Sequence, residues 1–99
     1  MFVFNTTFVV TVAAFEKWHA WQKGTYMPLL KNLLPGAEVK TFEVLSADQQ
    51  EGRTLSVQWR VATPTDLEVL NKQSPVVLGQ MASEFGSDAL FFSSILKEI

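Results

Sequence analysis

The sequence contains no cysteine and only one histidine in 99 residues. Without cysteine, disulfides, thiolate catalysis and cysteine-containing zinc sites are all excluded. A metal site needs several convergent ligands, and no residue near His19 in the sequence completes such a set. We therefore expect no metal and no cofactor, and we expect His19 to be a partly exposed structural residue.

An excess of charge of one sign is also missing. The formal net charge is −2, and the sequence has no basic stripe, so nucleic acid is not an expected partner. No run of lysine and arginine lies beside an apolar helix face, which argues against a membrane as partner. The apolar stretch 1–14 is shorter than the roughly 20 residues of a membrane span. Polar residues interrupt it and no basic residue precedes it, which favours a buried strand over a signal sequence. We expect a cytoplasmic protein.

Apolar residues, by contrast, are plentiful. Hydrophobic residues make up 47% of the chain, which is enough for a sizeable core in one domain spanning residues 1–99. A small domain without disulfides depends on packing alone, and self-association is one way to bury and pack more apolar surface.

The first strand is predicted over residues 2–12, where β-branched and aromatic side chains dominate. Alternate residues of a strand point to opposite faces. One face has Phe4, Thr6, Phe8, Val10 and Val12, and the other has Val3, Asn5, Thr7, Val9 and Thr11. Both faces carry apolar residues, as expected of a central strand covered on both sides.

A helical pattern follows over residues 14–33, where apolar residues recur at three- and four-residue steps. Gly24 and Pro28 interrupt this pattern, which predicts a first helix that ends near Lys23 and a second, short helix after it. Residues 34–36, Leu-Pro-Gly, predict a turn.

Two strands of a hairpin are predicted over residues 38–46 and 53–62, joined by the polar loop 47–52. The second of these strands alternates with a strict period of two. Its apolar face consists of Leu55, Val57, Trp59 and Val61.

The second helical region begins at Thr63, which suits a helix cap, and Pro64 suits the first helical position. Ser74-Pro75 repeats this signal, so the helix is expected to bend or restart there. Gly86 is expected to end it.

A last strand is predicted over residues 89–96. The resulting order, β-α-β-β-α-β, is the split βαβ pattern of an α+β, ferredoxin-like fold. Right-handed crossovers then produce a four-stranded antiparallel sheet with both helices on one face. Since the last strand is apolar on both faces, we expect the open sheet face to pair with a second copy as a homodimer. The alternative is a monomer whose C-terminal tail or a loop shields that face.

Several short segments also carry a family resemblance. They are Phe4-Asn5, the stretch from Trp18 to Trp21, Tyr26-Met27-Pro28, Ser56-Val57-Gln58-Trp59, Ser74-Pro75, and Glu84-Phe85-Gly86 with Phe92 and Leu96. With them the chain resembles a family of small bacterial proteins, known only as a domain of unknown function, with the dimeric α/β-barrel architecture. Family members usually have His-Ile-Pro at the position of Tyr26-Met27-Pro28. The resemblance implies the fold and the dimer, and it implies no established activity.

Chemical motifs are weak by comparison. Ser93 and Ser94 lie in a strand without the sharp turn of a nucleophile elbow, and only one histidine is available as base. Glu43 is the one carboxylate in the interior of the strand predicted over residues 38–46. Arg60 lies on the strand face opposite Trp59, where a dimer-interface or solvated role is favoured over an anion clamp.

One candidate ligand pocket can be named, between the first helix and the sheet. Asn5, Trp18, Tyr26, Gln58 and Trp59 have the mostly apolar composition, with a few polar groups, of a small-ligand site. Large aromatic residues at such spacings are more commonly plain core.

Two hypotheses about function follow. The first is a non-catalytic homodimeric module whose apolar surfaces serve assembly or partner binding. The second is a cofactor-independent enzyme of the monooxygenase or isomerase type, in which Tyr26 and Asn5 position an aromatic or quinone-like substrate. A tyrosine with its reference pKa near 10 can donate a hydrogen bond at neutral pH but is a poor base.

Overall fold

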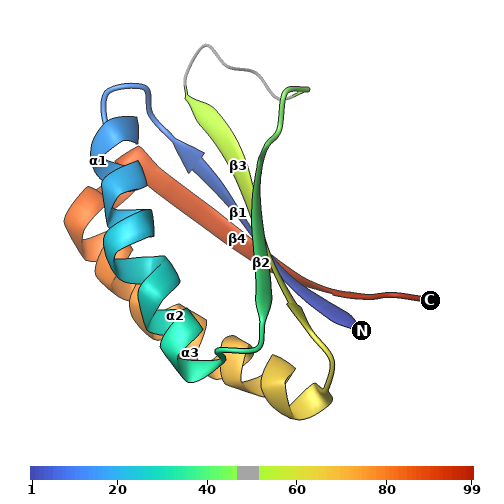
Figure 1. Cartoon of the computed structure of the whole chain (residues 1–99). Helices are drawn as coiled ribbons and strands as arrows, with labels where there is room; N and C mark the ends of the chain where they lie inside the picture. Colours follow the sequence, from blue (N-terminus) through green and yellow to red (C-terminus); the bar gives the residue numbers. More distant parts are fainter. Residues whose placement is uncertain (47–51) are drawn as a thin grey trace.

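The computed structural model describes residues 1–46 and 52–99. Its elements are β1 (Phe2–Val10), α1 (Phe15–Trp21), the π-helical segment η1 (Gln22–Tyr26), α2 (Met27–Leu33), β2 (Glu38–Glu43), β3 (Arg53–Val61), α3 (Pro64–Phe85), the 3-10 turn η2 (Gly86–Asp88) and β4 (Ala89–Lys97). The strands form one antiparallel sheet in the order β2-β3-β1-β4. All helices lie on one face of this sheet (Figure 1). The predicted α+β, ferredoxin-like order β-α-β-β-α-β is confirmed.

The first helical region is continuous from Phe15 to Leu33, so the predicted break after Lys23 is wrong. Instead of ending, the helix widens into η1, where the backbone N–H of Met27 donates to the carbonyl oxygen of Gln22, five residues earlier. Such a wide turn is a known way to hold an extra residue inside an α-helix. Pro28 follows directly after this wide turn, where the regular pattern of hydrogen bonds four residues apart is already interrupted.

The second helix is also continuous and does not restart at Ser74-Pro75, because α3 runs through Pro75 to Phe85. Its ends are as predicted. The Thr63 hydroxyl accepts a hydrogen bond from the backbone N–H of Asp66 at 3.1 Å, as an N-cap does. At the other end Gly86 has a φ of 56°, a conformation that glycine adopts at little cost.

The strand ends differ from the predictions by a few residues. β1 ends at Val10 because the chain turns next, with the backbone N–H of Ala14 donating to the carbonyl oxygen of Thr11. β2 ends at Glu43, where a turn follows at residues 45–46. The predicted polar loop 47–52 falls largely on residues 47–51, which lie outside the described residues.

The core lies between the sheet and the helices. The apolar faces predicted for β1 and β3 are buried there, including Phe8 and Trp59, except for Val12, which lies beyond the end of β1 and is exposed. The helices contribute Trp18, Tyr26, Leu30, Leu70, Val77 and Met81. Each large apolar side chain buried in this way contributes about 1.5–3 kcal/mol to stability. None of the described helices lies over the opposite face of the sheet (Figure 1).

Candidate functional site

The five residues of the predicted pocket separate into two groups on opposite faces of the sheet. Trp18, Tyr26 and Trp59 are buried on the helix side. Asn5 and Gln58 face each other across the β1–β3 pair and point to the open side, since their neighbours along each strand point to the core. The structure therefore does not bring the five residues into one space.

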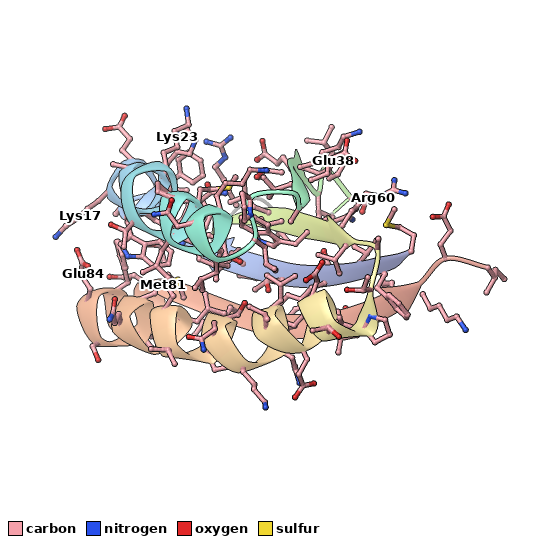
Figure 2. All side chains as sticks on the ribbon, turned by 60° about the horizontal axis from the view of Figure 1, so that its bottom comes forward. Lys17, Lys23, Glu38, Arg60, Met81 and Glu84 are labelled. Carbon is pink, nitrogen blue, oxygen red and sulfur yellow. The ribbon has the colours of Figure 1, made fainter. Side chains whose placement is uncertain are left out.

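The aromatic group is closely packed. The indole Nε1 of Trp59 donates a hydrogen bond to the hydroxyl of Tyr26 at 3.3 Å, and the two rings meet edge to face. The indole Nε1 of Trp18 lies 3.4 Å from Sδ of Met81, on the part of α3 that passes beside α1 (Figure 2). Phe8 contacts both Trp18 and Tyr26. Every polar atom of the three large rings is thus already engaged with another protein group.

The electrostatics of Tyr26 agree with a structural role. Burial raises the pKa of its phenol above the ordinary value of 10.0, and hydrogen bonds to Trp59 and Thr6 only partly offset this rise. A phenol with a raised pKa stays neutral at physiological pH and is a weaker acid than tyrosine in water. It can donate or accept a hydrogen bond but has no tendency to ionise.

Two surface hollows lie elsewhere on the molecule. One of about 460 Å³ runs along the first half of α3, and one of about 410 Å³ lies between the α2–β2 turn and the start of α3. Neither is lined by any residue of the predicted pocket. Whether Asn5, Trp18, Tyr26, Gln58 or Trp59 binds a ligand remains a prediction.

The polar residues on the open face form a short hydrogen-bonded chain. The Ser56 hydroxyl donates to Oδ1 of Asn5 at 2.5 Å, and Nδ2 of Asn5 donates to the hydroxyl of Thr7 at 3.3 Å. Nε2 of Gln58 donates to Ser56 at 3.4 Å. We call these four residues the polar cluster. Thr7 and Ser56 were not among the predicted site residues, although each lies two residues along the strand from Asn5 or Gln58 and therefore on the same face.

Large apolar side chains surround the polar cluster on the open face. β4 contributes Leu90, Phe92 and Leu96, which are 57%, 61% and 48% exposed. Val9 of β1 and Phe42 of β2 lie on the same face and are exposed as well. The open face is therefore a candidate interface, apolar at its sides and hydrogen-bonded at its centre.

The charged residues that the sequence analysis considered have ordinary partners. Both carboxylate oxygens of Glu43 accept hydrogen bonds from Arg53 at 2.9 Å, which lowers the pKa of Glu43, and the Arg53 guanidinium lies 3.8 Å above the ring of Phe15. Arg60 pairs with Glu98 at 3.2 Å. Arg60 and Glu38 lie together at the end of the sheet away from Lys17 and Glu84 (Figure 2).

The remaining candidates also make plain structural contacts. His19 is half-buried and its ring stacks on Phe15. The hydroxyl of Ser93 forms a hydrogen bond with that of Thr6 at 3.0 Å. Within residues 1–46 and 52–99, no three side chains of the metal-binding types gather into a possible metal site. None of the described helices is both long and apolar enough to cross a membrane.

Solved structures similar to this chain place the fold in a wider class. A de novo designed protein, Foldit4, has a TM-score of 0.68 at 10% identity, with 99% of this chain and 98% of that chain covered. An ethyl tert-butyl ether d (EthD) family protein from Bacillus halodurans has a TM-score of 0.62 at 14% identity, with both chains covered fully (100%). A dimeric ferredoxin-like protein from an uncultured marine organism has a TM-score of 0.57 at 17% identity, with 99% of this chain and 97% of that chain covered. These likenesses show a ferredoxin-like fold and nothing further.

The family itself is shown by sequence. The family model described as "Domain of unknown function (DUF4286)" matches residues 1–99, and the chain belongs to this family. The resemblance seen in the sequence is thereby confirmed. The search of curated proteins found no match.

Proposed function

We propose that this protein is a non-catalytic, homodimeric binding or assembly module of the bacterial cytoplasm, in which two copies pack their open sheet faces together as a dimeric α/β barrel. The observation that carries the proposal is the uncovered face itself, where Leu90, Phe92 and Leu96 are about half exposed. A contiguous apolar patch of this kind is uncommon on a soluble monomer and typical of an interface.

The size of the face suits a dimer. Strands spaced about 4.8 Å apart and rising about 3.3 Å per residue give this sheet, with three strands of nine residues and one of six, a footprint of roughly 520 Å². A standard interface buries about 800 Å² of accessible surface on each partner. Because projecting side chains have more accessible surface than their footprint, the open face alone supplies an interface of this order.

The polar cluster is compatible with burial in such an interface. Asn5, Thr7, Ser56 and Gln58 already bond one another, so covering them with a second sheet leaves fewer polar atoms without partners. The dimeric neighbour from the marine organism supports the proposal by analogy of fold.

A matched pair of valine substitutions tests this contact. Val9→Lys places a charge on the open face, and Val76→Lys places the same charge on an exposed site of α3 outside it. Light scattering at micromolar concentration should show the unchanged chain and Val76→Lys as oligomers of equal mass. Val9→Lys should have half that mass, because a buried unpaired charge disrupts the interface. A monomeric unchanged chain, or a Val9→Lys variant of full mass, contradicts the proposal.

The alternative enzyme hypothesis finds less support in the geometry. It needs Tyr26 and Asn5 to hold one substrate, and these residues lie on opposite faces of the sheet. A thermal-shift screen with quinones, flavins, haem and fatty acids tests it, because a ligand that binds the folded state raises the melting temperature. A quinone that stabilises the chain, with an effect lost in Tyr26→Phe, favours the enzyme over the non-catalytic module.

A further inference from the structure

The two edges of the sheet differ sharply in how they are protected. β2, at one edge, has six residues and carries Glu38, Lys40 and Glu43. β4, at the other edge, has nine residues with no proline and a single charge, Lys97 near its end. Natural sheets discourage edge pairing with short strands and charged side chains. β2 has both devices, whereas β4 has neither over residues 89–96.

The backbone groups of β4 that point outward can be identified. The N–H of Thr11 donates to the carbonyl of Asp88 at 2.9 Å, and the N–H of Glu98 donates to the carbonyl of Met1 at 3.0 Å. In an antiparallel ladder, every second residue directs its N–H and C=O to the same neighbour. The even-numbered residues from 88 to 98 therefore bond β1. The outward groups belong to the odd-numbered residues, which are Ala89, Phe91, Ser93, Ile95 and Lys97.

The side chains of β4 are exposed on both faces of the sheet. Phe91 and Ile95 point to the helix side, since they lie opposite Phe8 and Phe4, yet they are 39% and 50% exposed. Leu90 and Leu96 are exposed on the open face. A partner that covers only the open face leaves Phe91 and Ile95 uncovered. A strand that pairs with the edge of β4, by contrast, extends both faces of the sheet and can cover side chains on either one.

The sequence of β4 is complementary to itself. We propose that β4 pairs antiparallel with β4 of a second copy, about a two-fold axis that passes through Ser93. In this register all nine residues are paired. Phe91 lies opposite Ile95 of the second copy on the helix side, and Leu90 lies opposite Leu96 of the second copy on the open face. The contact goes beyond the proposed sheet-to-sheet dimer, because it uses a different surface.

The hydrogen-bonding pattern restricts how the two copies meet. Residues whose backbone groups point away from β1 in one copy must lie opposite such residues in the second copy, because only these residues can exchange hydrogen bonds. Residues that lie opposite each other in an antiparallel pair have side chains on the same face. The helices of both copies consequently lie on the same side of one continuous sheet of twice four strands. The joined open faces remain available for the sheet-to-sheet contact.

A single introduced cysteine tests the axis, since the chain has none of its own. Ser93→Cys places two thiols at positions directly opposite, where the Cα atoms are about 5.5 Å apart, within the range of a disulfide. Ser83→Cys, on the exposed surface of α3, controls for random collision. Under mild oxidation Ser93→Cys should cross-link on the order of tenfold faster than Ser83→Cys, because pairing raises the effective thiol concentration. Equal rates overturn the proposal.

A proline at an outward position provides a second, independent measurement. Ile95→Pro removes an outward N–H but no hydrogen bond to β1, so the strand itself should persist. Ile95→Thr shortens the same side chain and keeps the N–H. We expect Ile95→Pro to halve the mass seen by light scattering and Ile95→Thr to keep it. Equal masses for the unchanged chain and Ile95→Pro overturn the edge contact.

The two contacts can fail separately. If only the sheet-to-sheet dimer exists, Val9→Lys lowers the mass and Ile95→Pro does not. If only the edge contact exists, Ile95→Pro lowers the mass, Ser93→Cys cross-links and Val9→Lys has no effect. If both exist, each variant alone halves the mass, since two kinds of two-fold contact on one chain build an assembly larger than a dimer.

Discussion

The indole nitrogen of Trp59 and the hydroxyl of Tyr26 are joined by a hydrogen bond of 3.3 Å in the middle of the core. The bond connects β3 to the π-helical segment, and Thr6 of β1 lies beside the phenol and lowers its pKa. Thr6 in turn bonds Ser93 of β4. The one tyrosine of the chain therefore lies in a polar connection that runs from a helix across three strands.

Removing the hydroxyl should destabilise the fold. Tyr26→Phe leaves the buried N–H of Trp59 without its acceptor, and an unpaired buried donor costs about 1–3 kcal/mol. Urea denaturation measures this loss in the free energy of unfolding. Met81→Leu is the comparison, because it removes only the weak sulfur acceptor of Trp18 and should cost less. A Tyr26→Phe variant as stable as the unchanged chain contradicts a structural role for the hydroxyl.

Alkaline pH should weaken the fold through the same residue. Burial raises the pKa of Tyr26 above 10.0 in the folded chain, whereas the unfolded chain ionises near that value. The contribution of the neutral Tyr26 phenol to the free energy of unfolding is thus fully present below about pH 10. It is lost as the pH rises through the folded pKa, because the phenol of the unfolded chain releases its proton first. Ultraviolet absorbance of the phenolate reports Tyr26 alone. Urea curves of Tyr26→Phe at the same pH values should lack this part of the decline.

A buried serine offers a stabilising substitution. The hydroxyl of Ser74 is buried in α3 and has no hydrogen-bond partner among the described residues. Ser74→Ala removes this unpaired group and should raise the free energy of unfolding by about 1 kcal/mol. Ser83→Ala, at an exposed position of the same helix, measures the helix-propensity gain alone. The buried site should gain more than the exposed one, and an equal or smaller gain speaks against an unpaired hydroxyl.

Replacing two glycines by alanine should change the stability of the chain in opposite directions. A Cβ at Gly52 would lie 2.5 Å from the carbonyl oxygen of Val10, so Gly52→Ala should cost about 1–3 kcal/mol through overpacking. A Cβ at Gly79 meets nothing within 4 Å, and the residue lies in the interior of α3. Gly79→Ala should therefore stabilise by about 0.8–1.0 kcal/mol through helix propensity. Melting curves of the two variants should shift to opposite sides of the unchanged chain.

The fold could be predicted largely because its signals are local. The alternation of Leu55, Val57, Trp59 and Val61 identifies both a strand and its buried face, and the structure buries all four. The predicted helix end near Lys23 and the predicted restart at Ser74-Pro75 were wrong for a physical reason. Gly24, Pro28 and Pro75 each weaken a helix locally, but packing against the sheet outweighs that local cost.

The division of the candidate site into two groups was already contained in the alternation of the strands, whereas the face that the helices cover was not. Asn5 and Gln58 were grouped with Trp18, Tyr26 and Trp59 although alternation had already placed Asn5 on the face opposite Phe4. Which face the helices cover follows only from the three-dimensional crossover. Likewise, the exposure of Phe91 and Ile95 on the helix side could not be predicted, because it depends on how far α3 extends over the edge strand.

The wide turn at η1 means that the helix from Phe15 to Leu33 contains one residue more than a regular α-helix needs to connect the same buried positions. The buried residues of this helix recur at steps of four, as Trp18, Gln22, Tyr26 and Leu30. In a regular α-helix of 3.6 residues per turn, side chains four residues apart move gradually around the helix axis. The wider π turn offsets this rotation, so the four side chains stay on one face. A chain that lacks Gly24 would restore the regular 3.6-residue repeat and still present Trp18, Tyr26 and Leu30 to the sheet. We therefore expect a chain without Gly24 to keep the buried face of this helix, at the cost of placing Pro28 inside a regular helix.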